Sequence, residues 1–126
     1  HFHEVGALDA IGDVVGCCML LEQLAPAYIC ASPVSTGRGT VCWAHGELPV
    51  PAPATAFLLQ GIPTQPGPAA VTGELCTPTG AALLAQFAAS FGPRPALAEA
   101  ACGCGFGTKR FPLPNCVRAW LGYAPR

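Results

Sequence analysis

Apolar positions crowd the first part of the chain, where residues 7–24 are predicted to form one helix that ends before Pro26. Apolar side chains cover nearly every direction of this helix, and Asp9 and Asp13 are its only charged residues as far as position 21. Two carboxylates four residues apart share one helix face. Because a helix that is apolar nearly all round is usually buried, the pattern predicts a buried carboxylate pair.

A buried carboxylate pair needs a cation, since an unpaired buried charge is costly. His1, His3 and Glu4 lie directly upstream of the helix and offer further groups that bind divalent metals. We therefore expect a metal site formed by His1, His3, Glu4, Asp9 and Asp13. For Asp9 the alternative is helix capping, which is common for Asp near a helix start. Asp13 lies too far into the helix for that role.

A second helix is predicted at residues 81–91, between the sequence Thr77-Pro78-Thr79-Gly80 and a closing Gly92-Pro93. Threonine caps with a proline in the first turn are typical of a helix start. Free amides at such a start bind anions. We therefore expect an anion or nucleotide site at Thr77, Thr79 and Gly80.

Arg38 is a further candidate for this anion site, and the carboxylate Glu74 lies near that site in the sequence. Arg38 lies between two glycines in a predicted turn at residues 32–40, where it is exposed and suited to a carboxylate or phosphate. Glu74 directly precedes the helix start and is expected to face the same cleft. The alternatives are simpler: capping alone explains the threonines, and Arg38 is then only a solvent-exposed turn residue.

Between and after the helices the sequence alternates short strand patterns with turns. Strands are expected at residues 28–32, 40–44, 62–64, 71–76, 95–105 and 115–123, with the strand at 95–105 buried. A short helix is expected at 54–60, and three alternating prolines predict an extended strap at 48–53. This order predicts one α+β domain over residues 1–126, in which about three helices pack on a mixed sheet.

Composition narrows the functional classes. Among 126 residues, 52% are hydrophobic and only 10% charged, and the net charge of −1 gives no basic footprint for nucleic acid. So little charge on so apolar a chain predicts that other protein covers part of its surface, and we expect a homo-oligomer. The uncharged run at residues 75–93 is interrupted by Pro78 and Gly80, so no membrane-spanning segment is expected.

Eight cysteines are present, an even number that would suit a disulfide framework. No two of them form a C-x-x-C pair for zinc, although Cys102 and Cys104 are spaced to bind a soft metal weakly. Cys17 and Cys18 lie in the predicted first helix, and several others fall in predicted strands. We therefore expect reduced, mostly buried thiols and a cytoplasmic location.

The opening His1-Phe2-His3-Glu4-Val5-Gly6-Ala7, followed by Asp9 and Asp13, resembles the start of a block in the LarC family. These are nickel-insertion proteins for the nickel-pincer nucleotide cofactor of lactate racemase. Further matches follow in order along nearly the whole chain: Ala31-Ser32-Pro33, Gly37-Arg38-Gly39, Ala44-His45-Gly46, Leu48-Pro49-Val50-Pro51-Ala52-Pro53-Ala54-Thr55, Gly73-Glu74-Leu75, Thr77-Pro78-Thr79-Gly80-Ala81, Gly105-Phe106-Gly107-Thr108-Lys109 and Pro114-Asn115.

The resemblance implies a CTP-dependent cyclometallase, which places nickel into pyridinium-3,5-bisthiocarboxylate mononucleotide through carbon–nickel and sulfur–nickel bonds. The family chain is longer at both ends, and CTP with Mg or Mn is expected only in the full-length parent. The expected partners are the pincer nucleotide precursor and the missing N- and C-terminal parts of the parent. The alternative is a non-catalytic metal-binding or oligomerisation module.

Overall fold

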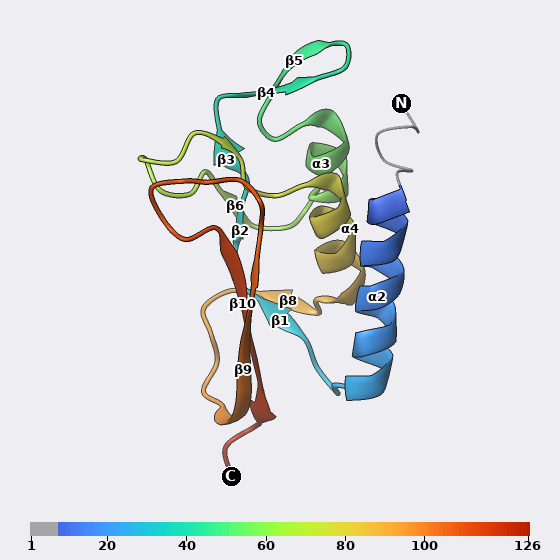
Figure 1. The fold of residues 1–126 in the computed structure, drawn as a ribbon. Coiled ribbons are helices and arrows are strands. Elements are labelled where there is room, and N and C mark those ends of the chain that lie inside the picture. The colour runs from blue at the N-terminus through green and yellow to red at the C-terminus, as the bar shows by residue number, and fades with distance from the viewer. Residues whose placement is uncertain (1–7) are drawn as a thin grey trace.

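The computed structural model describes residues 8–126 and shows an α+β fold. Its three described helices are α2 (Leu8–Leu24), α3 (Pro53–Leu58) and α4 (Pro78–Phe87). The helices gather on one side of the molecule, and the long hairpin of β9 (Ala98–Phe106) and β10 (Cys116–Tyr123) runs along the other side (Figure 1). The expected fold class is confirmed.

Both strong helices form where the sequence predicts them, with one boundary changed. α2 matches the prediction from Leu8 onward, and position 7 lies outside the described residues. α4 ends at Phe87, four residues before the predicted end, because the chain turns there to pair with another segment. The Ala89 amide donates to the Ile29 carbonyl at 2.7 Å, and the Gly92 amide donates to the Ala31 carbonyl at 2.8 Å.

Strand pairing is mixed, as expected, but it is divided among five two-stranded ladders in the described chain. Two ladders are parallel, β1–β8 and β2–β6, and three are antiparallel, β3–β7, β4–β5 and β9–β10. The shorter strands are β1 (Cys30–Ala31), β2 (Val34–Ser35), β3 (Gly37–Arg38), β4 (Thr40–Trp43), β5 (Gly46–Pro49), β6 (Thr64–Gln65), β7 (Gly73–Glu74) and β8 (Ser90–Phe91).

Two predicted loop segments are partly strands. The expected turn at residues 32–40 contains β2 and β3, which pair with β6 and β7. The first half of the proline strap is β5, which pairs with β4 so that Leu48 lies opposite Val41. The strap then continues through a cis Val50–Pro51 bond into α3.

The core is small and lies where β2, α3 and α4 meet. Val34, Leu59, Cys76 and Ala81 are its buried residues, and partly buried side chains such as Leu84 and Phe91 pack against them. Because Cys76 and Ala81 are both buried, the segment between them is anchored at its two ends. The start of α4, residues 77–80, is therefore held at the surface in a fixed position.

The predicted burial of the first helix is wrong. α2 has no buried residue, and Leu8, Ile11 and Met19 are 86%, 52% and 57% exposed. Its main contact in the described chain is with α4, so most of its circumference faces solvent. No described helix is long and apolar enough to cross a membrane.

Two other predictions of burial are also wrong. The strand expected to be buried at residues 95–105 forms as β9, but all nine of its residues are exposed. All eight cysteines are free, as expected, yet Cys76 alone among them is buried. The three predictions of burial are wrong for the same reason. A side chain is buried only when another surface packs on it, and the described chain packs little against these residues.

Candidate functional site: a groove between two helices

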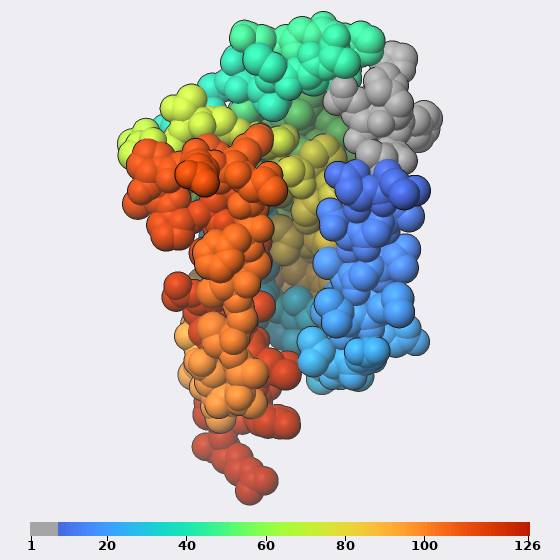
Figure 2. Space-filling view, in the orientation of Figure 1, coloured from blue at the N-terminus to red at the C-terminus, as the bar shows by residue number. Residues whose placement is uncertain are grey.

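An open groove of about 470 Å³ lies between α2 and the start of α4. Side chains from both helices line it, so the groove exists only because the two helices pack against each other. Figure 2 shows α2 standing apart from the β9–β10 hairpin, with α4 at the floor of the hollow between them. The volume lies in the range of small-molecule pockets, roughly 300–1,000 Å³, but this groove is wide open to solvent rather than enclosed.

α2 contributes to this groove two side chains of types that can bind metal ions. Asp13 and Cys17 both line it, because residues four apart lie on the same face of a helix. The glycines Gly12 and Gly16 line it too, and a Cβ atom at either position would meet no atom within 4 Å. The Asp13 carboxylate and the Cys17 thiol therefore face open space, and the two glycines beside them add no side chains to fill it.

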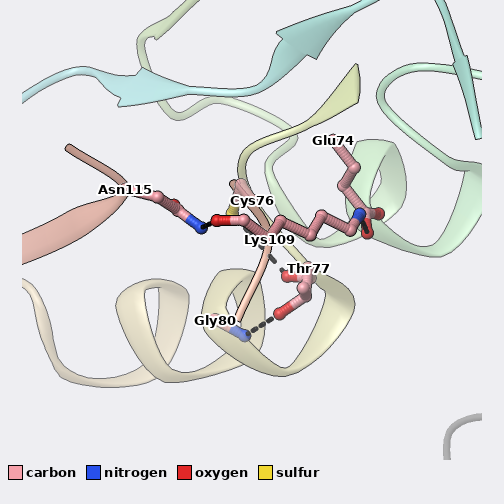
Figure 3. Close-up of polar contacts among 6 residues, drawn as sticks. All are labelled: Glu74, Cys76, Thr77, Gly80, Lys109 and Asn115. Atoms are coloured by element: carbon pink, nitrogen blue, oxygen red, sulfur yellow. Dashed lines mark hydrogen bonds and ion pairs between the residues drawn. The ribbon is translucent and has the colours of Figure 1, made fainter. Parts of the chain in front are cut away.

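α4 contributes its capped N-terminus. Thr77 is the N-cap, and its Oγ1 accepts a hydrogen bond from the Gly80 amide at 3.2 Å (Figure 3). The Ala81 amide donates to the Thr77 carbonyl at 2.9 Å, and Pro78 has no amide hydrogen. Within the described chain, Thr79 keeps the free amide of this first turn, and it lines the groove with Thr77 and Gly80.

The predicted metal ligands are divided by the structure. His1, His3 and Glu4 lie outside the described residues. Asp13 lines the groove, whereas Asp9 is exposed and its Oδ1 accepts a hydrogen bond from the Ala10 amide at 2.9 Å. Residues 8–126 contain no cluster of three or more His, Cys, Asp or Glu side chains placed to hold a metal ion.

The reason first given for a cation is therefore wrong, since both carboxylates are exposed rather than buried. Support for a cation now comes from the types of side chain present and from their positions in the groove. Asp13 and Cys17 both line the groove, and each is of a residue type that can bind a metal ion. Cys17 was not singled out from the sequence, although its spacing of four residues from Asp13 was visible there.

Arg38 lies away from the groove. It is on β3, opposite Gly73 of β7, and its Nη2 donates to the Gly67 carbonyl at 3.1 Å. The groove is lined by α2 and α4 residues only. Arg38 therefore holds the loop after β6 and is not among the residues that line the groove at the start of α4.

Glu74 forms a second polar cluster, next to the start of α4 but facing a different segment. Its side chain is 11% exposed, and its Oε2 lies 3.9 Å from Lys109 Nζ (Figure 3). Burial raises the pKa of Glu74, and the Lys109 charge opposes part of that shift. Burial, with a smaller contribution from Glu74, raises the pKa of the Cys76 thiol to about 11.

The loop that carries Lys109 is held by Asn115, whose Nδ2 donates to the Lys109 carbonyl at 3.2 Å. One signal for this contact is visible in the sequence: Lys109 and Arg110 are neighbouring positive charges in a chain with few charged residues. A carboxylate that is largely buried, as Glu74 is, is costly unless a cation pairs with it. The chain position of Lys109 did not indicate which carboxylate it meets.

Comparison with known proteins adds an independent finding. A family model described as nickel insertion protein matches residues 1–126. A Geobacter metallireducens relative is 52% identical over 125 residues, which cover 98% of this chain and 32% of the relative. No solved structure matches the chain significantly.

Two further relatives have more specific names. Proteins of Nocardioides sp. and Staphylococcus saprophyticus are named pyridinium-3,5-bisthiocarboxylic acid mononucleotide nickel insertion protein. They are 50% and 49% identical, over 97% and 94% of this chain and over 31% and 30% of their own lengths. The chain thus spans about a third of the length of these curated relatives.

Proposed function

Because the chain belongs to the nickel insertion protein family, we propose that it is the metal- and nucleotide-handling part of a CTP-dependent cyclometallase. The substrates are nickel and the pyridinium-3,5-bisthiocarboxylic acid mononucleotide for which two relatives are named. The product is the nickel-pincer cofactor of lactate racemase. CTP, with Mg or Mn, binds to the parts of the longer protein that this chain does not span.

The observation that supports this proposal most directly is the pairing of chemistries across the groove. Asp13 and Cys17 on α2 offer oxygen and sulfur ligands, while Thr77 and Thr79 begin α4 on the opposite side. The named substrate has matching ends: a phosphate on the nucleotide and two thiocarboxylates on the pyridinium ring. The free Thr79 amide and the helix dipole favour the phosphate. Nickel then lies between the substrate sulfurs and the α2 ligands.

An incomplete metal site suits a protein that gives its metal away. Asp13 accepts nickel as a carboxylate, and Cys17 loses its proton when it binds the metal. Two protein ligands leave coordination positions open for the thiocarboxylates of the substrate. His1, His3, Glu4 and Asp9 complete our proposed ligand set and hold nickel until the substrate replaces them.

The metal part of the proposal predicts a selective loss of nickel affinity. Asp13→Asn removes a charged ligand from the groove, so nickel should bind at least about tenfold more weakly, a loss of roughly 1.4 kcal/mol. Isothermal titration of the chain with nickel measures this change. Glu22→Gln is the matched control, because Glu22 is exposed on α2 but does not line the groove. Equal affinities in the two variants would remove Asp13 from the site.

The anion part is tested separately by an NMR titration with inorganic phosphate and then with a pyridine mononucleotide. The Thr79 amide signal should shift in a saturable way with both ligands, because it is the free donor of the first turn. The amide signal of Gly67, the residue whose carbonyl accepts a hydrogen bond from Arg38, serves as the reference. Saturable shifts near Gly67 without any at Thr79 would move the anion site to Arg38.

A non-catalytic metal-binding or oligomerisation module is the competing function, and the exposed apolar side chains of α2 and the exposed strand β9 favour it. The two functions differ in one outcome. The full-length protein should convert the precursor to a nickelated product that mass spectrometry detects. Nickel binding by the full-length protein, with no product in the presence of CTP and precursor, would favour the module.

Self-association and a cytoplasmic location belong to the same proposal. All residues of β9 and most of β10 are exposed, and each strand of this two-stranded ladder has a free edge in the described chain. Free edges pair readily with other copies. The eight free thiols suit a reducing compartment. Sedimentation of the purified chain should show a dimer or larger species, and a monomer at high concentration would contradict this.

A further inference from the structure

α2 carries an apolar stripe of exposed residues that do not line the groove. We call it the α2 seam and define it by four residues spaced three, four and four positions apart: Leu8, Ile11, Val15 and Met19. These side chains are 86%, 52%, 50% and 57% exposed. Such spacing places them on one narrow face, which is the pattern used when one helix packs along another.

The chain as a whole has more surface than its size explains. Its accessible surface is 8787 Å² for a mass of 12.8 kDa. A folded monomer of that mass typically exposes about 6,300 Å². The excess agrees with the comparisons, because the chain spans only 30–32% of the length of its relatives. A large part of a family polypeptide therefore remains to cover these faces.

The charges on α2 indicate what kind of helix fits the seam. Asp9, Asp13 and Glu22 are its charged residues, and it contains no Lys or Arg. Asp13 lines the groove, so Glu22, three positions after Met19, is the acidic residue that borders the seam. A second copy of α2 would bring acidic residues together, and an anionic membrane surface would repel them. A helix with basic residues beside its apolar face would match both the apolar side chains of the seam and the acidic charge of α2.

The size of the seam favours a covalently linked partner over a separate molecule. A helix of 17 residues is about 25 Å long. Contact along one such helix is too small for a standard interface between separate proteins, which buries about 1,200–2,000 Å². A helix in the same polypeptide needs less area, because linkage gives it an effective concentration in the millimolar range.

We propose that the α2 seam is the docking site for an amphipathic helix with flanking Lys or Arg residues, supplied by the part of the longer family polypeptide that this chain does not span. The docked helix covers Leu8, Ile11, Val15 and Met19, none of which lines the groove. This proposal does not depend on the nickel chemistry of the groove.

Cys18 provides a native probe of this docking. It is exposed, it borders the seam next to Met19, and neighbouring Cys17 faces the groove instead. The experiment measures the rate at which N-ethylmaleimide modifies Cys18, by peptide mapping, in the 126-residue chain and in the full-length polypeptide of its gene. We expect Cys18 to react about tenfold more slowly in the full-length polypeptide, the ratio that a docking free energy of about 1.4 kcal/mol produces.

Substitutions identify the cause of that protection. Val15→Asp places a carboxylate in the seam and should return Cys18 in the full-length polypeptide to the rate of the short chain. Leu113→Asp is the matched control, since Leu113 is 45% exposed in the loop between β9 and β10. It should leave the protection unchanged. Because Val15 is half exposed, Val15→Asp is compatible with folding, which circular dichroism checks; the comparison of unsubstituted chains decides the question independently.

Three results would overturn the proposal. Equal rates at Cys18 in the short and full-length chains would show that nothing covers the seam. Protection already present in the short chain, lost in Val15→Asp together with a fall in sedimentation mass, would place a second copy there. Protection that does not weaken as salt is raised to about 1 M, where charges are screened within about 3 Å, would rule out the basic flanks.

Discussion

At the scale of single residues, Cys76 is the thiol whose surroundings differ most from water. It is 7% exposed, and burial followed by the charge of Glu74 raises its pKa to about 11 from an ordinary 9.0. At pH 9 we expect about one in a hundred molecules to carry the Cys76 thiolate. Peptide mapping after alkylation across pH 8–12 should therefore show a Cys76 midpoint near pH 11. A midpoint near 9.0 would contradict the burial.

The same shift has a consequence for stability, and its sign is fixed. The native state holds the Cys76 proton more tightly than the unfolded chain does, so the contribution is full below pH 9.0 and is lost as the pH rises toward about 11. Urea midpoints should fall across that range. Cys76→Ala is the control, because it removes the titrating thiol while keeping a small apolar side chain.

Two glycines should respond to alanine in opposite directions. Gly37 has φ +99°, and a Cβ there would collide with the Gly73 carbonyl oxygen, so Gly37→Ala should cost at least about 1–3 kcal/mol of unfolding free energy. Gly12 lies inside α2 with no atom near its missing Cβ, and Gly12→Ala should stabilise by about 0.5–1 kcal/mol. Thermal denaturation measures both. The same sign in both variants would refute the account.

For single residues, the sequence predicted the type of functional side chain better than its burial or its neighbours. The side-chain types at Asp13, Thr77 and Thr79 were visible, and the structure brings these three to one groove. Whether a carboxylate is buried was not visible, because burial depends on residues distant in sequence. Lys109 shows the same limit, since the sequence reveals its charge but not that it lies 3.9 Å from Glu74.

At the scale of elements, the start of α4 depends on one side chain. Thr77→Ala removes the acceptor for the Gly80 amide and should destabilise the protein by about 1 kcal/mol. Thr77→Ser keeps an acceptor oxygen and should recover most of that loss. Chemical denaturation of both variants provides the comparison. An alanine variant as stable as the serine variant would mean that the cap hydrogen bond contributes little.

Helices were predicted better than strands for a physical reason. The signals for α2 and α4 are local: apolar spacing, a capping threonine and a proline in the first turn. Strands such as β2 and β3 are two residues long and exist because β6 and β7 pair with them. No periodic pattern can appear in two residues. The early end of α4 has a similar cause, because pairing with β1 takes over at Ser90.

At the scale of the whole molecule, we expect the chain by itself to make no nickelated product. It has six Lys and Arg residues scattered along its length and no phosphate-binding P-loop sequence, so it lacks an obvious means of holding CTP. Mixing the purified chain with CTP, nickel and precursor, followed by mass spectrometry, tests this expectation. The full-length Nocardioides relative is the positive control. Multiple turnovers by the short chain would show that the remaining segments are dispensable.

The overall class was predictable because it follows from the order of helices and strands, whereas the exposure of α2 and β9 was not. An apolar helix such as α2 predicts that something covers it, but the sequence does not say whether the cover comes from this chain. Residues 8–126 cover little of it. The apolar pattern is therefore consistent with a surface completed elsewhere in a longer protein.

The long-range ladders also set an order of events during synthesis. β1 forms only by pairing Cys30 and Ala31 with Ser90 and Phe91, so it stays unpaired until position 91 has left the ribosome. The core residues Val34, Leu59, Cys76 and Ala81 have emerged by then, whereas β9 and β10 come afterwards and, within residues 8–126, pair only with each other. Translation thus delivers a complete core before the hairpin exists. A ribosome that stalls within the hairpin would still carry residues 8–92, which contain all the buried residues of the core cluster.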